Sequence, residues 1–321
     1  MNLLISSSSD PYRNLATEEI LLKNSTEDFL FLYINRPCVV VGKHQIVQKE
    51  INSQFVHDNN ILIARRLSGG GTVYHDEGNL NLSFIQSIQP GENASYRIMT
   101  QPLFNYLANN GLSIELSEKN DFLLGGKKIS GSAMHIYKNR VLAHCTLLID
   151  CNLTNLSNAL KGNWERFTDK SIASRKSTVL NLSSIDKKLS PDYILKGFVD
   201  FIKNEEEICT DFSFFDKINT QSIGELIKIK YATFDWIYGY SPKYLYHNTI
   251  YFDQRIIAYT LEIEKNIIKN VLIESEDSLT KIIRLKLNSL KGRQHNISSL
   301  REWLNSPNQT DFDIQLLASL F

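Results

Sequence analysis

Arg65–Ser83 reads Arg-Arg-Leu-Ser-Gly-Gly-Gly-Thr-Val-Tyr-His-Asp-Glu-Gly-Asn-Leu-Asn-Leu-Ser, and the organisation of the chain can be worked out from it. The residues just before it, 61–64, are apolar and β-prone, which predicts a buried strand. Three consecutive glycines then allow positive φ angles and a close approach of the backbone to a ligand. Two further strands are predicted over residues 72–75 and 79–85, joined by an Asp-Glu-Gly turn.

The last of these strands alternates apolar and polar side chains, so its two faces differ in character. One face is apolar and the other carries amide and hydroxyl groups: Leu80, Leu82 and Phe84 against Asn79, Asn81 and Ser83. We therefore expect one face to pack in the core and the other to line a binding site.

The glycine triplet between arginines suits an anionic ligand, because backbone N–H groups and guanidinium forks bind phosphate or carboxylate. Two familiar nucleotide-binding motifs are absent from the sequence: Gly-x-Gly-x-x-Gly between strand and helix, and Gly-x-x-x-x-Gly-Lys-Ser/Thr. Taken alone, the triplet is equally compatible with a hairpin whose arginines are solvated. The residues around it favour a ligand site.

The whole of Arg65–Ser83 resembles the signature of the lipoate–protein ligases, Arg-Arg-x-Ser-Gly-Gly-Gly-x-Val-x-His-Asp-x-Gly-Asn-x-x-x-Ser. A second segment of that family, Gly-Lys-Lys-Ile-Ser-Gly-Ser-Ala, stands at Gly126–Ala133. The resemblance implies an α/β fold of the α+β type. It also implies a large catalytic, lipoyl-adenylate-binding domain of mixed and antiparallel sheets over residues 1–244, and a small α+β accessory domain over residues 245–321.

The composition is that of an ordinary globular protein, with 42% hydrophobic and 22% charged residues among 321. The 35 basic and 35 acidic residues cancel, which argues against a general nucleic-acid binder. The four cysteines (Cys38, Cys145, Cys151 and Cys209) form no Cys-x-x-Cys pair, which favours a reduced, cytoplasmic protein over a disulfide scaffold or zinc site. We expect no signal peptide, no membrane span and no membrane partner, and we expect a monomer.

Helix and strand signals place the other elements. Asp10-Pro11 predicts a helix start, because Asp can cap a helix and Pro fits its first position. A helix is also expected over 95–110, where Pro102 must either kink it or start a second helix. The remaining predictions are strands at 29–34, 39–42, 112–116 and 122–124 and helices at 153–160, 190–202 and 222–230. Three strands and helices at 279–290, 298–304 and 312–320 are expected after residue 245.

A hairpin is expected around Lys138-Asn139-Arg140, and the length of its turn decides which side chains share a face. A two-residue turn pairs His144 with Ala133, on the face opposite Lys128. A three-residue turn pairs His144 with Met134, on the face of Lys128. The resemblance places the histidine of His-x-Thr-Leu-Leu at the ligand, so we favour the three-residue turn.

Lys128 is the predicted central residue of the site. A compact ammonium can hold an acyl carbonyl and an α-phosphate oxygen together and stabilise charge developing on either. The family's lysine directly precedes Ile-Ser-Gly, which identifies Lys128 rather than Lys127; a solvated turn is the preferred interpretation for Lys127.

The resemblance also implies the residues that surround the substrate or adenylate. These are Tyr33, Arg66, Ser68, Gly69, Gly70, Gly71, Asn79, Ser130, His135, His144 and Ser174. Tyr33 is expected to be a core aromatic residue more than a direct contact, and Asp121 is the candidate metal ligand. Residues 170–182 resemble the adenylate-binding loop of the family, and an exposed loop is the alternative. Trp236 is expected to pack in the core.

The activity that the resemblance implies is ATP-dependent. Lipoate attacks the α-phosphate of ATP to give lipoyl-AMP, and a lysine of an acceptor domain then takes the lipoyl group. The family implies ATP and Mg²⁺ as cofactors and, as partners, lipoyl domains of 2-oxoacid dehydrogenase complexes or the glycine cleavage H protein.

Three alternative functions can be weighed against the sequence. An octanoyl- or lipoyltransferase of the same fold would carry the acyl group on a cysteine, for which Cys145 and Cys151 are candidates. A biotin–protein ligase would need a Gly-x-Gly-Arg-x-Gly loop, which is absent. A scaffold that binds acyl-carrier domains without activating the acid is the non-enzymatic alternative.

Overall fold

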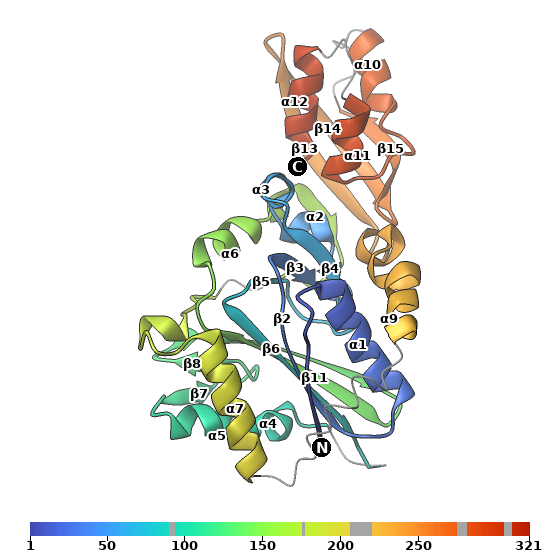
Figure 1. Ribbon diagram of the computed structural model, residues 1–321. Coiled ribbons are helices and arrows are strands. Elements are labelled where there is room, and N and C mark those ends of the chain that lie inside the picture. Colours follow the sequence, from blue (N-terminus) through green and yellow to red (C-terminus); the bar gives the residue numbers. More distant parts are fainter. Residues whose placement is uncertain (90–93, 175–176, 206–219, 275–280, 305–309) are drawn as a thin grey trace.

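A computed structural model describes residues 1–89, 94–174, 177–205, 220–274, 281–304 and 310–321. Figure 1 shows a large lower body and a smaller upper part, which holds the orange and red C-terminal elements. Within the described residues, no helix is long and apolar enough to cross a membrane.

The elements follow one another in an α+β order. The helices are α1 (Pro11–Asn24), α2 (Val47–Glu50), α3 (Ser53–Asp58), α4 (Tyr96–Met99), α5 (Gln101–Asn109), α6 (Leu153–Ala159), α7 (Pro191–Glu205), α9 (Thr220–Leu226), α10 (Lys281–Asn288), α11 (Ile297–Leu304) and α12 (Asp311–Ser319). The strands are β1 (Asn2–Ile5), β2 (Phe29–Ile34), β3 (Cys38–Val41), β4 (Leu62–Arg65), β5 (Val73–His75), β6 (Asn79–Ser87), β7 (Ile114–Leu116), β8 (Phe122–Leu124), β9 (Lys127–Lys128), β10 (Ser130–Tyr137), β11 (Arg140–Leu148), β12 (Phe167–Asp169), β13 (Tyr244–Phe252), β14 (Arg255–Glu264) and β15 (Ile267–Ile273).

A five-stranded sheet in the order β1-β2-β6-β11-β10 forms the centre of the large body. Its apolar face, which carries Leu80, Leu82 and Phe84, packs in one core cluster with residues of α4, α5 and α7. Helix α1 lies on the opposite side (Figure 1), where Phe31 and Tyr33 join a second cluster. The alternation predicted for residues 79–85 is therefore confirmed, and the polar face is turned toward α1 and the interior.

The two proline-based helix predictions are also confirmed. The Asp10 side chain accepts hydrogen bonds from the backbone N–H of Tyr12 at 2.8 Å and of Arg13 at 3.4 Å, and Pro11 is the first residue of α1. Helix α4 ends at Met99 and α5 begins at Gln101, so Pro102 lies in the first turn of a new helix. Proline fits there because the first N–H groups of a helix have no intrahelical partner.

The prediction of a three-residue turn between β10 and β11 is wrong. Tyr137 pairs with Arg140, so the turn contains Lys138 and Asn139 alone, and Lys138 adopts a φ of 54°. Arg140 is held in the strand because its guanidinium donates to Ser87 Oγ at 2.8 Å and to a backbone carbonyl beyond the sheet. These contacts come from distant parts of the chain. The turn length therefore could not be predicted from local turn preferences.

Three smaller sheets complete the architecture. Two of them, β4-β3-β5 and β7-β8-β9, lie in the large body, and the third has the order β12-β13-β14-β15. Helices α10, α11 and α12 contribute to the core cluster of this third sheet. Its strand β12 comes from the middle of the chain, so the large body and the C-terminal part share one sheet.

Arg65 is fully buried at the end of β4 and bonds mainly to backbone carbonyls. Its Nη1 donates to the carbonyls of residues 42, 43 and 45, each at 2.9 Å. Its Nε donates to the carbonyls of Trp236 and Ile237 at 2.9 Å, and Nη2 reaches Ser241 Oγ at 3.1 Å. The Trp236 indole donates back to the Arg65 carbonyl at 2.8 Å, which confirms that Trp236 packs in the core.

Burial without a carboxylate partner in the described residues lowers the pKa of Arg65 to about 10. We expect Arg65→Lys to lower the free energy of unfolding by about 3 kcal/mol, because an ammonium cannot replace a planar fork that bonds several carbonyls at once. Chemical denaturation measures the change. The matched control is Arg36→Lys, at a half-exposed arginine 3.6 Å from the Asp10 carboxylate, which should cost no more than about 0.5 kcal/mol. Equal effects of the two substitutions would contradict this account.

Candidate active site

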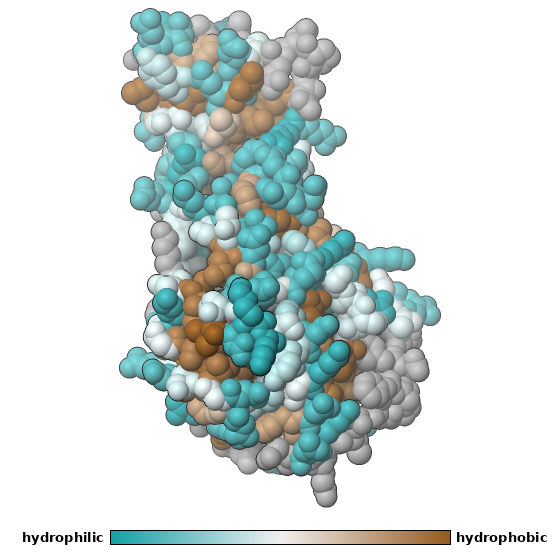
Figure 2. Space-filling view, turned by 60° about the vertical axis from the view of Figure 1, so that its left-hand side comes forward, coloured by the Kyte–Doolittle hydropathy of each residue, from teal (hydrophilic) through white to brown (hydrophobic). Residues whose placement is uncertain are grey.

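Two adjoining cavities open beside the glycine triplet. The helix-side cavity, of about 520 Å³, is lined by α6 and the segment after it, and the histidine-side cavity, of about 400 Å³, is lined by His75 and His144. In the space-filling view that brings this side of the large body forward, apolar residues gather among hydrophilic ones (Figure 2). The residues that line both cavities are Thr72, Val73, Lys128, Gly131, Thr146, Ser174 and Ser177. A ligand with two chemically different halves could therefore occupy both.

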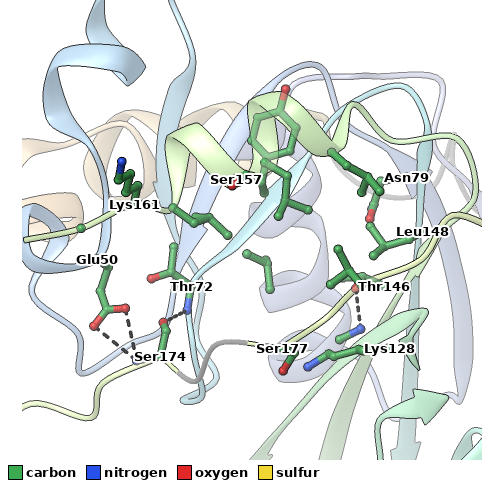
Figure 3. Close-up of a pocket in the computed structure, with 18 of the residues that line it drawn as sticks. Glu50, Thr72, Asn79, Lys128, Thr146, Leu148, Ser157, Lys161, Ser174 and Ser177 are labelled. Carbon is green, nitrogen blue, oxygen red and sulfur yellow. Dashed lines mark hydrogen bonds between the residues drawn. The ribbon is translucent and has the colours of Figure 1, made fainter. Parts of the chain in front are cut away.

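Lys128 lies where the two cavities meet. Its backbone is held in a parallel bridge, with its N–H donating to the Thr178 carbonyl at 2.9 Å and its carbonyl accepting from the Leu180 N–H at 3.0 Å. Its Nζ lies 3.0 Å from Asp121 Oδ2. Figure 3 shows Lys128, Ser177 and Ser174 along one edge of the helix-side cavity. Lys128 thus presents an ammonium to whatever joins the two halves of the ligand.

His144 lines the same cavity as Lys128 although the turn has two residues and His144 pairs with Ala133. The reason is that Lys128 lies in β9, which belongs to a different sheet from β10. Ile129 separates the two strands and bonds to both Phe122 and Leu148. The alternation of side chains along β10 does not continue through this break to Lys128. The two-residue turn therefore does not place Lys128 on the side opposite His144, as continuous alternation would require.

Glu18 of α1 orients His144, and it is not among the site residues expected from the sequence. It is 2% exposed, and its Oε1 lies 2.9 Å from Tyr33 Oη and 3.1 Å from His144 Nδ1; Ser83 Oγ also donates to it. Because a carboxylate oxygen that takes two hydroxyl donors is an acceptor, His144 Nδ1 carries a proton. The signal available in the sequence was the place of Glu18 in the helix predicted to start at Asp10-Pro11.

Arg66 supports the glycine loop from inside. Its Nη2 donates to the carbonyls of Gly69 and Gly71, each at 2.7 Å, and its Nε donates to Ser68 Oγ at 3.0 Å. Gly70 between them has a φ of 88°, which favours glycine. Arg66, Gly70 and Gly71 line the histidine-side cavity, whereas Ser68 and Gly69 line neither cavity.

The other predicted residues fall into four groups. Tyr33 lines the histidine-side cavity, Asn79 and Ser130 line the helix-side cavity, and Ser174 lines both. Ser174 Oγ accepts from the Thr72 backbone N–H at 2.8 Å, which fastens the 170–182 loop onto the glycine loop. His135 lines neither cavity, and its burial lowers its pKa. Arg175 and Lys176 of the loop lie outside the described residues.

The described cysteines are poorly suited to carry an acyl group. Burial raises the pKa of Cys145 to about 12 and also raises the pKa of Cys151. Both side chains are buried, and Cys145 belongs to the apolar core face of the central sheet. Because the thiolate is the reactive form, these surroundings work against a cysteine nucleophile. Cys209 lies outside the described residues.

Asp121 is the predicted metal ligand, and it already has two protein partners. Its Oδ2 pairs with Lys128, and its Oδ1 accepts from Ser132 Oγ at 3.1 Å. Among the residues that the structure describes, no group of three or more His, Cys, Asp or Glu side chains could hold a metal ion.

Comparison with known proteins identifies relatives of this chain. Residues 10–202 match the family described as the lipoyl protein ligase A/B catalytic domain. The chain is 32% identical to the lipoate-protein ligase LplJ of Bacillus subtilis, over 94% of this chain and 92% of that protein. It is 33% identical to lipoate–protein ligase 1 of Staphylococcus aureus, over 92% and 91% of the two chains. A crystal structure of a lipoate-protein ligase A bound with ATP superposes with a TM-score of 0.60 and 25% identity, covering 74% of this chain and 98% of that one.

Lys128→Ala should abolish formation of an acyl adenylate while leaving the fold intact. The substitution removes the ammonium at the junction of the cavities and no core volume, and loss of such a charge costs about 100-fold or more in rate. The measurement is ATP–pyrophosphate exchange, with circular dichroism to check the fold.

Lys127→Ala is the matched control, because Lys127 is exposed and should lose little activity. If both variants lost activity equally, the assignment of the central role to Lys128 would be wrong.

Proposed function

Since the chain belongs to the lipoyl protein ligase A/B family and is an ATP-dependent lipoate–protein ligase, we propose that its two cavities hold the two halves of a lipoyl adenylate. The observation that carries this proposal is the position of Lys128, which lines both cavities and lies where they meet. A mixed anhydride that spans the two cavities would have its reactive centre beside the Lys128 ammonium.

The acyl chain is assigned to the histidine-side cavity and the AMP moiety to the helix-side cavity. Apolar side chains such as Leu15, Val40 and Tyr33 line the histidine-side cavity and suit an aliphatic chain. The helix-side cavity offers the Trp164 ring for stacking and Lys161 for a phosphate or ribose, and it lies under the 170–182 loop. Both assignments agree with the family resemblance at His144 and at that loop.

The reaction proceeds in two steps. A carboxylate oxygen of lipoate attacks the α-phosphorus of ATP, and the bond to the pyrophosphate breaks. The amine of an acceptor lysine then attacks the acyl carbon, and AMP leaves with the electron pair of the anhydride bond. Lys128 stabilises the negative charge that develops on the phosphoryl oxygens in the first step and on the acyl oxygen in the second.

Mg²⁺ would accompany ATP and be held by its phosphates together with Asp121. Mg²⁺ in such sites keeps several waters and needs only one or two carboxylates besides substrate phosphates, so a single aspartate fits. The ion would neutralise phosphate charge during activation. We also propose that the acceptors are lipoyl domains of 2-oxoacid dehydrogenase complexes or the glycine cleavage H protein, and that the enzyme acts as a monomer in the cytoplasm.

The function is tested by ATP–pyrophosphate exchange with and without lipoate. Exchange should depend on lipoate, and Cys145→Ser and Cys151→Ser should each retain at least about half of it, since a nucleophilic cysteine is not needed when an adenylate carries the acyl group. Intact-mass measurement of the protein incubated with acyl donor would reveal a contrary result. An acyl thioester on either cysteine would assign the protein to the transferases that carry the acyl group on a cysteine.

The domain division at residue 244 is proposed to separate activation from transfer. Residues 1–244 contain every residue assigned to the site, and residues 245–321 contain none. Strand β12 pairs with β13 of the C-terminal sheet, with Asp169 opposite Tyr244, and the 170–182 loop begins directly after β12. A movement of the C-terminal sheet would therefore carry the loop with it, closing the site for activation and opening it for a bulky acceptor.

A chain truncated after residue 244 should bind lipoyl-AMP and transfer its acyl group, but it should make little adenylate from ATP. Removal of β13 leaves β12 without its partner strand, so the loop loses the support it needs while ATP reacts. The two half-reactions should be assayed on one preparation, with the full chain as the reference. ATP-dependent ligation at the full rate by the truncated chain would show that the C-terminal part is dispensable for activation.

A further inference from the structure

His75, at the end of β5, has one ring nitrogen that no group in the described ranges pairs with. The side chain is 4% exposed and lines the histidine-side cavity, as Lys128 does. Its Nε2 is buried and has no hydrogen-bond partner in the part of the chain that the structure describes. A buried polar atom without a partner is costly, so such an atom at a cavity wall points to a partner supplied by a ligand. His75 belongs to the signature stretch but is not among the site residues expected from the sequence.

A chain of two buried asparagines determines which nitrogen of His75 carries the proton. Asn14 Nδ2 donates to the backbone carbonyl of Ser8 at 2.9 Å, and a carbonyl can only accept. The same Nδ2 group donates to Asn35 Oδ1 at 2.8 Å, which leaves Asn35 Nδ2 facing His75 Nδ1 at 3.1 Å. An amide nitrogen is a donor, so Nδ1 must offer its lone pair and the proton of a neutral ring must lie on Nε2.

The ring is neutral over the working range of pH. Burial, together with the charges of Arg66 and His144, lowers the pKa of His75 to about 3. Cys38 is the residue paired with His75 on the neighbouring strand, and burial keeps its thiol protonated by raising its pKa. Asp76 follows His75 in the chain, and its side chain turns to backbone N–H groups of Gly78 and Asn152.

We propose that His75 binds the acyl substrate, with its Nε2–H donating a hydrogen bond to an oxygen at the carboxyl end of the acid, and that Asn14 and Asn35 are positioning residues that keep the proton on that nitrogen. The proposal rests on the assignment of the histidine-side cavity to the acyl group. Oxygen is the expected acceptor because the sulfur atoms of a disulfide ring accept hydrogen bonds weakly. A neutral donor can serve both the carboxylate of the free acid and the carbonyl of the adenylate, since neither bond requires a change of charge on the ring.

The tautomer can be measured without any assay of activity. In protein labelled with ¹⁵N-histidine, the shifts of His75 should show a protonated Nε2 and an unprotonated Nδ1 near neutral pH. The signals are assigned by their loss in His75→Gln. A proton on Nδ1, or on both nitrogens, at neutral pH would overturn the proposal, whatever the substrate of the enzyme is.

The donor function is tested by two substitutions at His75 itself. Gln keeps an N–H donor and Leu has none, so His75→Leu should lower kcat/KM for lipoate in pyrophosphate exchange about tenfold more than His75→Gln does. Equal loss in the two variants would overturn the donor function. Wild-type protein in the same assay tests the proposed function separately, because absence of lipoate-dependent exchange there would refute the ligase activity and leave the tautomer measurement standing.

Asn35→Asp tests the positioning role through the pH profile. The new carboxylate accepts from Nδ1, so a neutral ring keeps its proton on Nδ1 and loses the Nε2 donor, whereas a protonated ring retains it. The carboxylate also raises the pKa of the ring, so activity should fall as pH rises through that raised pKa, a limb that the wild type lacks. The double substitution with His75→Gln should remove this limb. A profile of Asn35→Asp that follows the wild type would overturn the role of the asparagine pair.

Discussion

A buried guanidinium, with no counter-ion among the residues that the structure describes, holds the large body to the segment that leads into the C-terminal sheet. Arg65 donates to carbonyls of the 42–45 turn and to Trp236 and Ile237, so three stretches far apart in sequence meet at one side chain. A charged group in this position is stabilised only if its donors are all used, and backbone carbonyls provide acceptors with fixed positions. The geometry of the glycine loop, which begins at the next residue, depends on this anchor.

The glycine triplet taken alone was equally compatible with solvated arginines. Both signature arginines are instead buried and bond to the protein's own backbone. Arg66 places three of its contacts on the loop it belongs to, at Ser68, Gly69 and Gly71. The loop is thus organised before any ligand arrives, with its backbone lining the histidine-side cavity. A site arranged in advance in this way spends less binding free energy on ordering the loop.

Buried side chains from the first 35 residues form hydrogen bonds with the two histidines that line the histidine-side cavity. Glu18 of α1 determines the protonation of His144 at Nδ1, and Asn14 with Asn35 determines that of His75 at Nε2. The two histidines consequently turn differently arranged nitrogens to the same cavity. A ligand group held between them would meet the fixed Nε2–H donor of His75, while Lys128 lies where this cavity meets the neighbouring one.

Local pattern alone determined much of this protein. The alternation over residues 79–85 sorted core from site, and Pro11 and Pro102 marked helix starts. Lys128 was singled out by the resemblance to the family, whose lysine directly precedes Ile-Ser-Gly. These signals depend on near neighbours in sequence, where backbone geometry sets which side chains share a face. Tertiary structure decided the rest: the two-residue turn, held by contacts of Arg140 with Ser87 and the Glu27 carbonyl; the burial of Glu18; the break at Ile129 that lets Lys128 line the same cavity as His144; and the addition of β12 to the C-terminal sheet. Each of these depends on a partner tens to hundreds of residues away, and no periodicity within a single segment records which partner that will be.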